Sequence, residues 1–262
     1  MRTSNRGLRI GVAVALSVLG TAAGTAQSLE RRVADAPDGL VRFAFAARPG
    51  VEGDGGRSVR WSCGDGRCGR TDSYWRRAAC DTGPARVTLT VREGTVRTAT
   101  VAVGAERGSD GTDLGRVSTV EAASYLLALA RSAPDRVGRE AVLAAALADS
   151  VTVWPDLLAL ARNPGIARDT RRAAVFWVGQ AAEEAATRGL TDLLDRSETD
   201  REVQDAAVFA LSQRPADEGV PALIGVARTH RDPAIRRRAM FWLGQSGDPR
   251  ALAFFEQVLT GT

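Results

Sequence analysis

Lysine is absent from this sequence, and histidine occurs once, at His230. All 35 basic residues are therefore arginines. This excludes chemistry that needs a lysine nucleophile, the lysine of a phosphate-binding loop, or several histidine ligands on one metal ion. Long apolar runs are also missing, because no stretch approaches the roughly 20 residues that a membrane-spanning helix requires. A channel or transporter is thereby excluded.

The composition is that of an ordinary globular protein. The 262 residues are 44% apolar and 25% charged, which is enough apolar material for a sizeable core. The net charge of +4 divides unevenly: residues 1–26 hold three arginines and no acid, residues 27–116 hold 15 arginines and 12 acids, and residues 117–262 hold 17 arginines and 19 acids. Without the first segment the chain is close to neutral, so the charge does not predict a nucleic-acid partner.

The first 26 residues have the pattern of a secretory signal peptide. Arg2, Arg6 and Arg9 precede an apolar stretch over residues 10–20, and small residues follow up to Ala26. We therefore expect an exported protein, periplasmic or secreted from a bacterium, with no stable membrane insertion after cleavage. An uncleaved membrane anchor is the alternative, although the apolar stretch is short for a span.

Three cysteines, Cys63, Cys68 and Cys80, lie close together. In an exported protein this predicts a disulfide, from Cys80 to Cys63 or Cys68, with the third thiol free or paired between molecules. Zinc is the alternative, and its fourth ligand would have to be one of three nearby aspartates: Asp65, Asp72 or Asp81. A catalytic thiol would need a basic partner, and His230 lies in a distant segment. No metal or cofactor is expected.

Residues 39–104 predict a small β module. Val41, Phe43 and Phe45 alternate with other residues as one buried face of a strand does, and residues 85–104 read as a hairpin turning at Glu93-Gly94. The glycine-rich segments 49–56 and 63–67 are expected to be loops; a phosphate cradle would need a following helix. Residues 105–117 are rich in glycine and acids and are expected to be a linker.

The rest of the chain, residues 118–262, repeats with a period of about 32 residues. The hexapeptide LLALAR occurs at 126–131 and 157–162, and related octapeptides occupy 173–180, 206–213 and 238–245. Such a period predicts an α-solenoid of about four to five repeats, here with five second helices and about four first helices. Helix starts are indicated by a capping box from Ser118 to Glu121, and by Asp-Pro pairs at Asp232 and Asp248.

The segments RDTRRAAVFWVGQ and RDPAIRRRAMFWLGQSGDPRALAFFEQVL resemble the short bacterial HEAT-like repeat, including the subtype named after phycobilisome lyases. Shared features are Asp-Pro, a basic pair, small residues in the first helix, Leu-Gly and a second Asp-Pro. Departures are Ser212 in place of glycine and a longer turn after Gln180. The resemblance implies a solenoid that binds other macromolecules. Iron-dependent hydroxylases of this repeat type use His-Glu pairs, which a chain with one histidine cannot supply.

One recurring position of the first helices predicts a contact surface. If Ala174 and Val178 face the core, a rotation of 100° per residue places Phe176 on the opposite side of its helix. The same position in the next two copies is again phenylalanine: Phe209 and Phe241. The three rings would form an aromatic ridge that contacts a partner, unless the β module or a stacked helix covers them or the helical phase is off by one residue. Two neighbouring tryptophans are expected to be mostly buried members of this site: Trp177 and Trp242.

Two arginine groups are expected to lie on a solvated face: Arg171 with Arg172, and Arg236 with Arg237 and Arg238. Ser150, Asp149 and His230 could be arranged on paper as a catalytic triad, but no nucleophile-elbow sequence surrounds any serine.

The sequence therefore predicts an α+β multidomain protein, with a small N-terminal β module followed by a C-terminal all-α HEAT-like solenoid. The predicted function is an exported, non-catalytic protein-binding or assembly scaffold that acts through its repeat surface. The alternative is an envelope enzyme or a lyase-like accessory factor, with a site between the β module and the solenoid.

Overall fold

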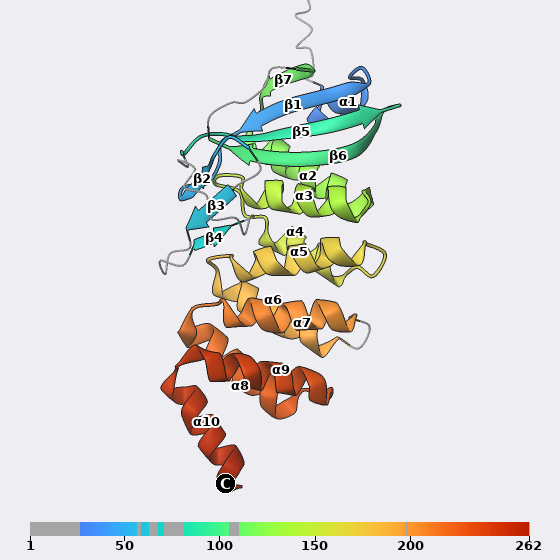
Figure 1. Cartoon of the computed structure of the whole chain (residues 1–262). Helices are drawn as coiled ribbons and strands as arrows, with labels where there is room; N and C mark the ends of the chain where they lie inside the picture. The colour runs from blue at the N-terminus through green and yellow to red at the C-terminus, as the bar shows by residue number, and fades with distance from the viewer. Residues whose placement is uncertain are drawn as a thin grey trace, which may run out of the picture.

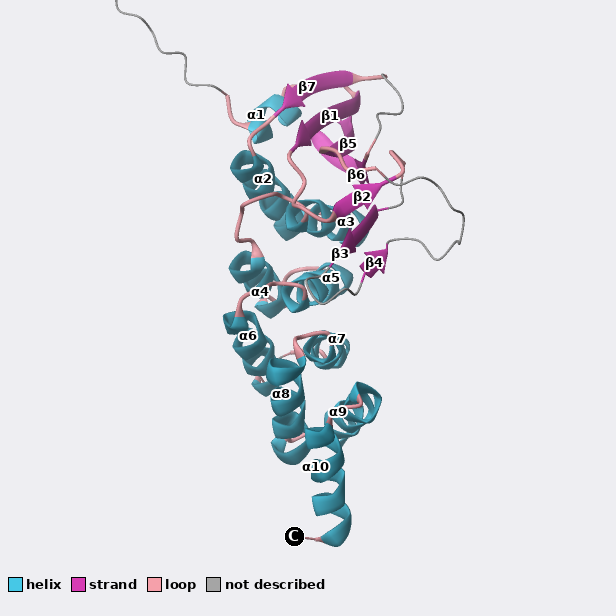
Figure 2. Cartoon of the chain, turned by 90° about the vertical axis from the view of Figure 1, so that its left-hand side faces the viewer, coloured by secondary structure: helices cyan, strands magenta, loops and turns pink. Residues whose placement is uncertain are grey.

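The structure is a computed structural model that describes residues 27–56, 59–62, 68–70, 81–104, 110–196 and 199–261. A β region at the N-terminal end is followed by a column of helices (Figure 1). Seen from the side, the helices form two parallel rows and the larger sheet lies across one end of the column (Figure 2). The predicted signal peptide, residues 1–26, lies outside the described residues and stays a prediction.

The described part of the β region forms two sheets, with strand orders β6-β5-β1-β7 and β2-β3-β4. Its elements are α1 (Leu29–Ala34), β1 (Gly39–Phe45), β2 (Val51–Gly53), β3 (Val59–Ser62), β4 (Cys68–Arg70), β5 (Ala85–Arg92), β6 (Thr95–Val103) and β7 (Thr112–Arg116). The predicted alternation is confirmed, because Val41, Phe43 and Phe45 are all buried. The predicted hairpin turn is also confirmed: Glu93 and Gly94 have φ angles of 52° and 66°, as a tight β-hairpin turn requires.

The predicted linker over residues 105–117 is wrong in its second half. Residues 112–116 form β7, which pairs in parallel with β1, and the backbone N–H of Val117 donates to the carbonyl of Ala44. This segment has no apolar alternation, since the burial of β7 is intermediate or exposed throughout. Its strand conformation comes from hydrogen bonding to the edge of β1, which a pattern of side chains cannot reveal.

The larger sheet and the helices share one continuous core. Phe43 on β1 packs edge-on against Tyr125 on α2, with ring centroids 6.0 Å apart. Burial, and to a smaller extent the carboxylate of Glu30, raises the pKa of Tyr125. The sheet thus covers the apolar end of the helical column, the role that a capping unit has in repeat proteins.

The helices form two rows, as predicted. In the described residues the first helices are α3 (Asp135–Ala146), α5 (Arg168–Gly179), α7 (Arg201–Ser212) and α9 (Pro233–Ser246). The second helices are α2 (Thr119–Ser132), α4 (Trp154–Arg162), α6 (Glu184–Asp195), α8 (Ala216–Thr229) and α10 (Pro249–Thr260). The first helices stack on one another in chain order, and so do the second helices.

The predicted helix starts are confirmed. The side chains of Ser118, Asp232 and Asp248 each accept a backbone N–H from the first turn of the helix that follows. The capping box at Ser118 differs in one respect: the carboxylate of Glu121 accepts the backbone N–H of Leu29, 2.8 Å away. Glu121 therefore ties the start of α1 to α2.

Among the described residues, no strand lies over the far end of the column. On α10, Leu252, Val258 and Leu259 are 61%, 53% and 86% exposed. No helix of the described residues is long and apolar enough to span a membrane.

Candidate functional site

The predicted aromatic ridge is part of a longer aromatic row. The rings of Phe176 and Phe209 lie nearly parallel, with centroids 6.5 Å apart. Phe209 then contacts Trp242 at 5.1 Å, and Trp242 contacts Phe241 at 5.1 Å. At the other end, Trp61 on β3 packs against Phe176 at 6.0 Å and Trp177 at 4.8 Å. We call these six residues the aromatic row: Trp61, Phe176, Trp177, Phe209, Phe241 and Trp242.

The helical phase used to predict the ridge is right. Ala174 and Val178 are fully buried, while Phe241 is 54% exposed and Phe176 and Phe209 are half-buried. Exposure rises along the row because Trp61 of the β module packs on the Phe176 end. The two predicted tryptophans differ: Trp177 is buried and Trp242 is half-buried. Trp61 could not be assigned to the row from the sequence, since it joins the row only through tertiary packing.

The arginine groups are not uniformly solvated. Arg171 is only 4% exposed, so its assignment to a solvated face is wrong. Its Nε donates to the carbonyl of Ile166 at 3.1 Å, and it pairs with Asp200 at the start of α7. Arg236 is half-buried and donates to the carbonyl of His230 at 2.7 Å. The other three arginines are exposed, as predicted: Arg172, Arg237 and Arg238.

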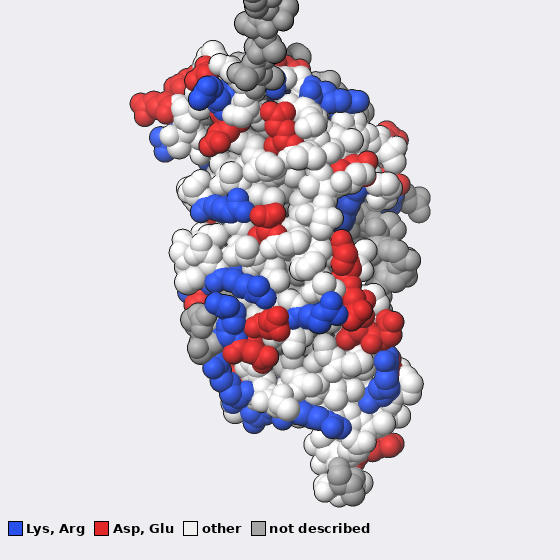
Figure 3. Space-filling view, turned by 180° about the vertical axis from the view of Figure 1, so that it is seen from behind, with Lys and Arg blue, Asp and Glu red and all other residues white. Residues whose placement is uncertain are grey.

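Ion pairs occur on both helical rows: on the first helices, Arg168, Arg172 and Arg238 pair with Glu202, Asp169 and Asp205. On the second helices, charged side chains of both signs lie next to each other (Figure 3). Three ion pairs account for much of this pattern: Arg131 with Asp156, Arg162 with Asp192, and Arg188 with Glu184. On the first helices, four exposed arginines make no hydrogen bond or ion pair within the described part of the chain: Arg136, Arg139, Arg201 and Arg237.

Consecutive first helices end side by side, at the turns into the second helices, and we call the space between two neighbouring ends a seam. The first seam lies between the ends of α3 and α5, the second between those of α5 and α7, and the third between those of α7 and α9. The turns lie along the left-hand edge of the solenoid in Figure 1. The residue that follows the recurring glutamine differs between them: Ala181 in the first seam, Arg214 in the second and Ser246 in the third, at shifts of 33 and 32 residues. These three positions determine how each seam is filled.

Arg214 fills the second seam. Its guanidinium is buried and donates to the carbonyls of Ala181 and Glu183 in the preceding turn, the latter at 3.0 Å. It also pairs with Glu218 at 2.8 Å and donates to the hydroxyl of Thr187 at 2.8 Å. Burial alone would raise the pKa of Glu218, but the hydrogen bonds from Thr187 and Arg214 outweigh it and the pKa is lowered. This network joins three helices.

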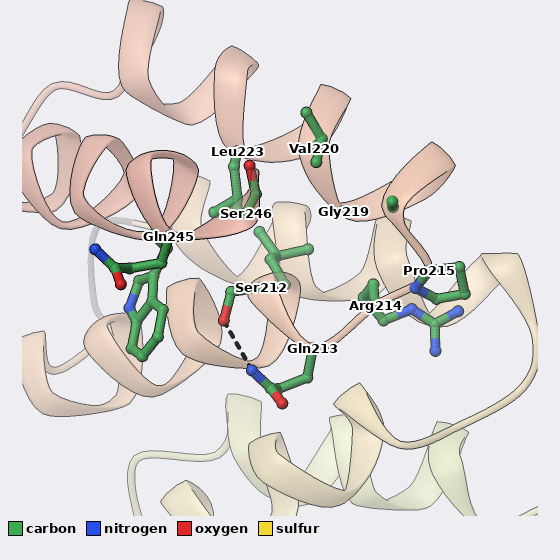
Figure 4. Close-up of a pocket in the computed structure, with 12 residues that line it drawn as sticks. Ser212, Gln213, Arg214, Pro215, Gly219, Val220, Leu223, Gln245 and Ser246 are labelled. Atoms are coloured by element: carbon green, nitrogen blue, oxygen red, sulfur yellow. Dashed lines mark hydrogen bonds between the residues drawn. The ribbon is translucent and has the colours of Figure 1, made fainter. Parts of the chain in front are cut away.

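The first and third seams are open. The first holds a hollow of about 390 Å³ whose lining includes Arg48, Trp154, Trp177 and Glu183. Arg48, from the loop between β1 and β2, places its guanidinium over the ring of Trp177 at 5.3 Å. The third seam holds a hollow of about 450 Å³ between the ends of α7 and α9. Figure 4 shows Ser246 and Gln245 on one side of this hollow and Ser212 and Gln213 on the other, with the side chain of Arg214 turned away from Ser246.

A third hollow, of about 660 Å³, lies where the β module meets α3 and α5. We call it the junction groove. Its walls include Trp61, Phe176 and Trp177 of the aromatic row, and Arg136, Arg139 and Glu140 also line it. This is the region in which the alternative function, an enzyme or accessory factor, was predicted to have its site.

The remaining candidates are not assembled into a site. His230 lies against the carbonyl of Leu194, with Nε2 at 3.0 Å, while Ser150 lines the first seam, so no triad forms with Asp149. Cys63 and Cys80 lie outside the described residues, as does the side chain of Cys68, and their disulfide stays a prediction. Within the described residues, no three His, Cys, Asp or Glu side chains are grouped as a metal site requires.

Comparison with known protein families agrees with the repeat architecture. Residues 187–262 match the family of HEAT repeats. The helices therefore form a HEAT-like solenoid, with a β region that covers its first repeat. No curated protein matches the sequence.

Proposed function

We propose that this protein is an exported, non-catalytic scaffold that binds a protein partner through the aromatic row on its first helices. The observation that carries the proposal is the exposed end of that row, where Phe209, Trp242 and Phe241 lie in contact across two repeats. Exposed aromatic surface of this kind is typical of protein interfaces, in which aromatic residues are anchors. HEAT repeats in general mediate protein interactions, and the match over residues 187–262 is compatible with this role.

The distribution of charge supports the same surface. Both rows contain ion pairs, but Arg201 and Arg237 on the first helices form none within the described residues. Their charges act on the carboxylate of Asp232, whose pKa they help to lower. A partner could bury the aromatic row and place acidic groups near these arginines. The shifted pKa values of Glu218 and Asp248 also support a structural role for the titratable groups, because each carboxylate is hydrogen bonded to an arginine of its own chain. Export is proposed from the N-terminal sequence, and relation to the phycobilisome-lyase subtype from the repeat residues.

The test is capture of a partner from the exported protein fraction by the purified chain and its variants. Phe209→Ser combined with Phe241→Ser should abolish capture, because it removes the exposed aromatic surface. The matched control is Val120→Ser, which removes a side chain that is 62% exposed on α2 of the other row, and capture should be retained. Since Phe209 is half-buried, the melting curve of the double variant is recorded, and Phe241→Ser alone serves if the double variant unfolds. Equal capture by wild type and the Phe241 variant would contradict the proposal.

The junction groove favours a second candidate, an accessory factor or enzyme that binds a ligand between the β module and the solenoid. Its volume of about 660 Å³ lies in the range of small-molecule sites, and it combines aromatic walls with Arg136 and Arg139. Replacing both arginines by serine separates the two candidates. Loss of partner capture in that variant, with capture unaffected by Phe241→Ser, would favour the groove.

A further inference from the structure

The second and third seams are built from the same backbone positions. Gly179, Ala181 and Glu183 correspond to Ser212, Arg214 and Ala216 at a shift of 33 residues. In the second seam the carbonyl oxygens of Gly179, Ala181 and Glu183 all face the guanidinium of Arg214, at distances up to 3.5 Å. The corresponding residues, Ser212, Arg214 and Ala216, line the hollow of the third seam, but the residue equivalent to Arg214 there is Ser246.

Two of those three carbonyls are available in the third seam. The carbonyl of Ala216 accepts from Arg250 at 2.9 Å. No hydrogen bond among the described residues ends on the carbonyl oxygens of Ser212 or Arg214. The hydroxyl of Ser246 is engaged with the carbonyl of Leu243 at 2.7 Å and is too short to cross the hollow. The third seam therefore has hydrogen-bond acceptors but no side chain that does there what the guanidinium of Arg214 does in the second seam.

The first seam provides a second precedent. Trp177 and Trp242 occupy equivalent positions, and each lines the hollow of its seam. Over Trp177 lies the guanidinium of Arg48, at 5.3 Å from the ring centroid, a typical cation–π arrangement. An arginine of this chain therefore lies in each of the first two seams: Arg48 over a tryptophan ring in the first, and Arg214 against backbone carbonyls in the second. The third seam has both a tryptophan, Trp242, and the residues that correspond to those carbonyls.

The electrostatics of the third seam suit a cation. The C-terminal ends of α7 and α9 lie at this hollow and carry partial negative charge, while the first turns of α8 also line it and carry partial positive charge. The second seam has the same arrangement of helix ends, from α5, α6 and α7, around the guanidinium of Arg214. Arg250 stands at the rim, but its charge is matched by Asp248, whose carboxylate it contacts at 2.7 Å. The exposed arginines of the first helices are distant: Arg201 is at the start of α7 and Ser212 is at its end, about 16 Å away at 1.5 Å per residue. That separation exceeds the screening length at physiological ionic strength, about 8 Å.

We infer that the third seam, between the ends of α7 and α9, binds a guanidinium group, namely an arginine side chain of the protein partner. The inference rests on the proposed function, because it names the chemistry by which the partner is recognised. Trp242 belongs to both the aromatic row and this hollow. A partner arginine in the seam would therefore sit directly beside the apolar contact surface.

The first test uses peptides and the wild-type chain. A fluorescein-labelled heptapeptide with one central arginine is compared by fluorescence anisotropy with the same peptide carrying citrulline or lysine. Citrulline keeps the shape and loses the charge, and charge-assisted hydrogen bonds are about twice as strong as neutral ones. We expect binding to be at least about tenfold weaker with citrulline, and intermediate with lysine, which lacks the planar fork of donors. Equal binding of the arginine and citrulline peptides, or of the arginine and lysine peptides, would overturn the inference.

The second test fills the seam from within. Ser246→Arg with Arg250→Glu recreates the spacing of Arg214 and Glu218, so the new arginine should occupy the third seam and weaken binding of the arginine peptide at least about tenfold. The control is Gly244→Arg, which adds the same charge on α9 where a side chain would meet no atom within 4 Å, and binding should be retained. Unchanged binding by the filled variant contradicts the inference. If that variant does not fold, the peptide series on the wild type decides alone.

The two proposals fail in different ways. If partner capture depends on Phe209 and Phe241 but is unaffected by filling the third seam, the arginine inference is wrong and the scaffold proposal stands. If capture does not depend on the phenylalanines, the scaffold proposal is wrong whatever the peptides show.

Discussion

The second and third seams of the solenoid share one backbone plan and differ in a single decisive side chain. Arg214 closes the second seam with hydrogen bonds to the preceding turn, whereas Ser246 leaves a hollow of about 450 Å³ in the third. In a repeat protein, each interface between neighbours contributes separately to stability. The comparison shows that one position decides whether such an interface is closed by a side chain or left open.

A reciprocal change accompanies this difference in the first helices. Trp177 and Trp242 stand in the repeats whose seam residues are small, Ala181 and Ser246, while Ala210 stands in the repeat that carries Arg214. Ala210 is buried, and a Cβ added at Gly179 would lie only 2.9 Å from its Cβ. The closed seam therefore brings α5 and α7 close together, and the larger tryptophans are confined to the open seams.

The largest effect is expected from breaking the closed seam with Arg214→Ala. The change leaves the half-buried carboxylate of Glu218 without its charged partner and the carbonyl of Glu183 without its donor. Removing one partner of a buried ion pair costs about 3–5 kcal/mol. The free energy of unfolding, measured by denaturant titration with circular dichroism, should fall by that amount. Arg188→Ala removes an exposed pair with Glu184 and should cost less than about 1 kcal/mol. Similar losses in both variants would show that the second seam is not a structural network.

An intermediate effect is expected from widening the same seam with Gly179→Ala. The added methyl group would meet Ala210 at 2.9 Å to its Cβ and 3.1 Å to its Cα, and overpacking of this kind costs about 1–3 kcal/mol. Gly244→Ala is the matched control beside the third seam, because nothing lies within 4 Å of an added Cβ there. Alanine favours a helix over glycine by about 1 kcal/mol, so the control should gain stability while Gly179→Ala loses it. Thermal melting of both variants measures the difference, and a gain in both would contradict the close approach of α5 and α7.

The sequence predicted what depends on local periodicity. The repeat period predicted two rows of helices, and the Asp-Pro pairs at Asp232 and Asp248 predicted helix starts. The position of Phe176 relative to Ala174 predicted a ring on the side of its helix away from the core. Contacts between segments far apart in the chain were not predictable. Arg214 lies 31 residues from Glu183, whose carbonyl it binds, and β7 is a strand only because it pairs with β1. Burial of Arg171 was missed for the same reason, since Asp200 belongs to the next repeat.

The smallest effect on stability is expected from a change of pH. It allows a comparison of two acids, Glu218 in the second seam and Asp248 beside the third. Hydrogen bonds from the side chain and backbone of Arg250 lower the pKa of Asp248 to about 2, and the pKa of Glu218 is also lowered. Carboxylates with a lowered pKa in the folded state bind more protons when the chain unfolds. Their contribution to stability is therefore complete above the ordinary carboxylate range, near pH 5, and is lost as the pH falls toward about 2 for Asp248.

The melting temperature of the wild type should accordingly be steady from about pH 7 to 5 and fall at lower pH, where paired carboxylates become protonated. Asp248→Asn should make this fall shallower down to about pH 2, by removing the carboxylate at the rim of the third seam. Glu218→Gln should lower stability at neutral pH as well, because it leaves the buried guanidinium of Arg214 without its charged partner. Asp192→Asn removes a carboxylate whose side chain is 69% exposed and should leave the acid limb unchanged. Asp248→Asn should also lose the contribution of its ionised carboxylate at neutral pH, but less than Glu218→Gln, because its partner Arg250 is 45% exposed whereas the side chain of Arg214 is 1% exposed. A loss at neutral pH as large as that of Glu218→Gln would contradict the distinction between a closed and an open seam.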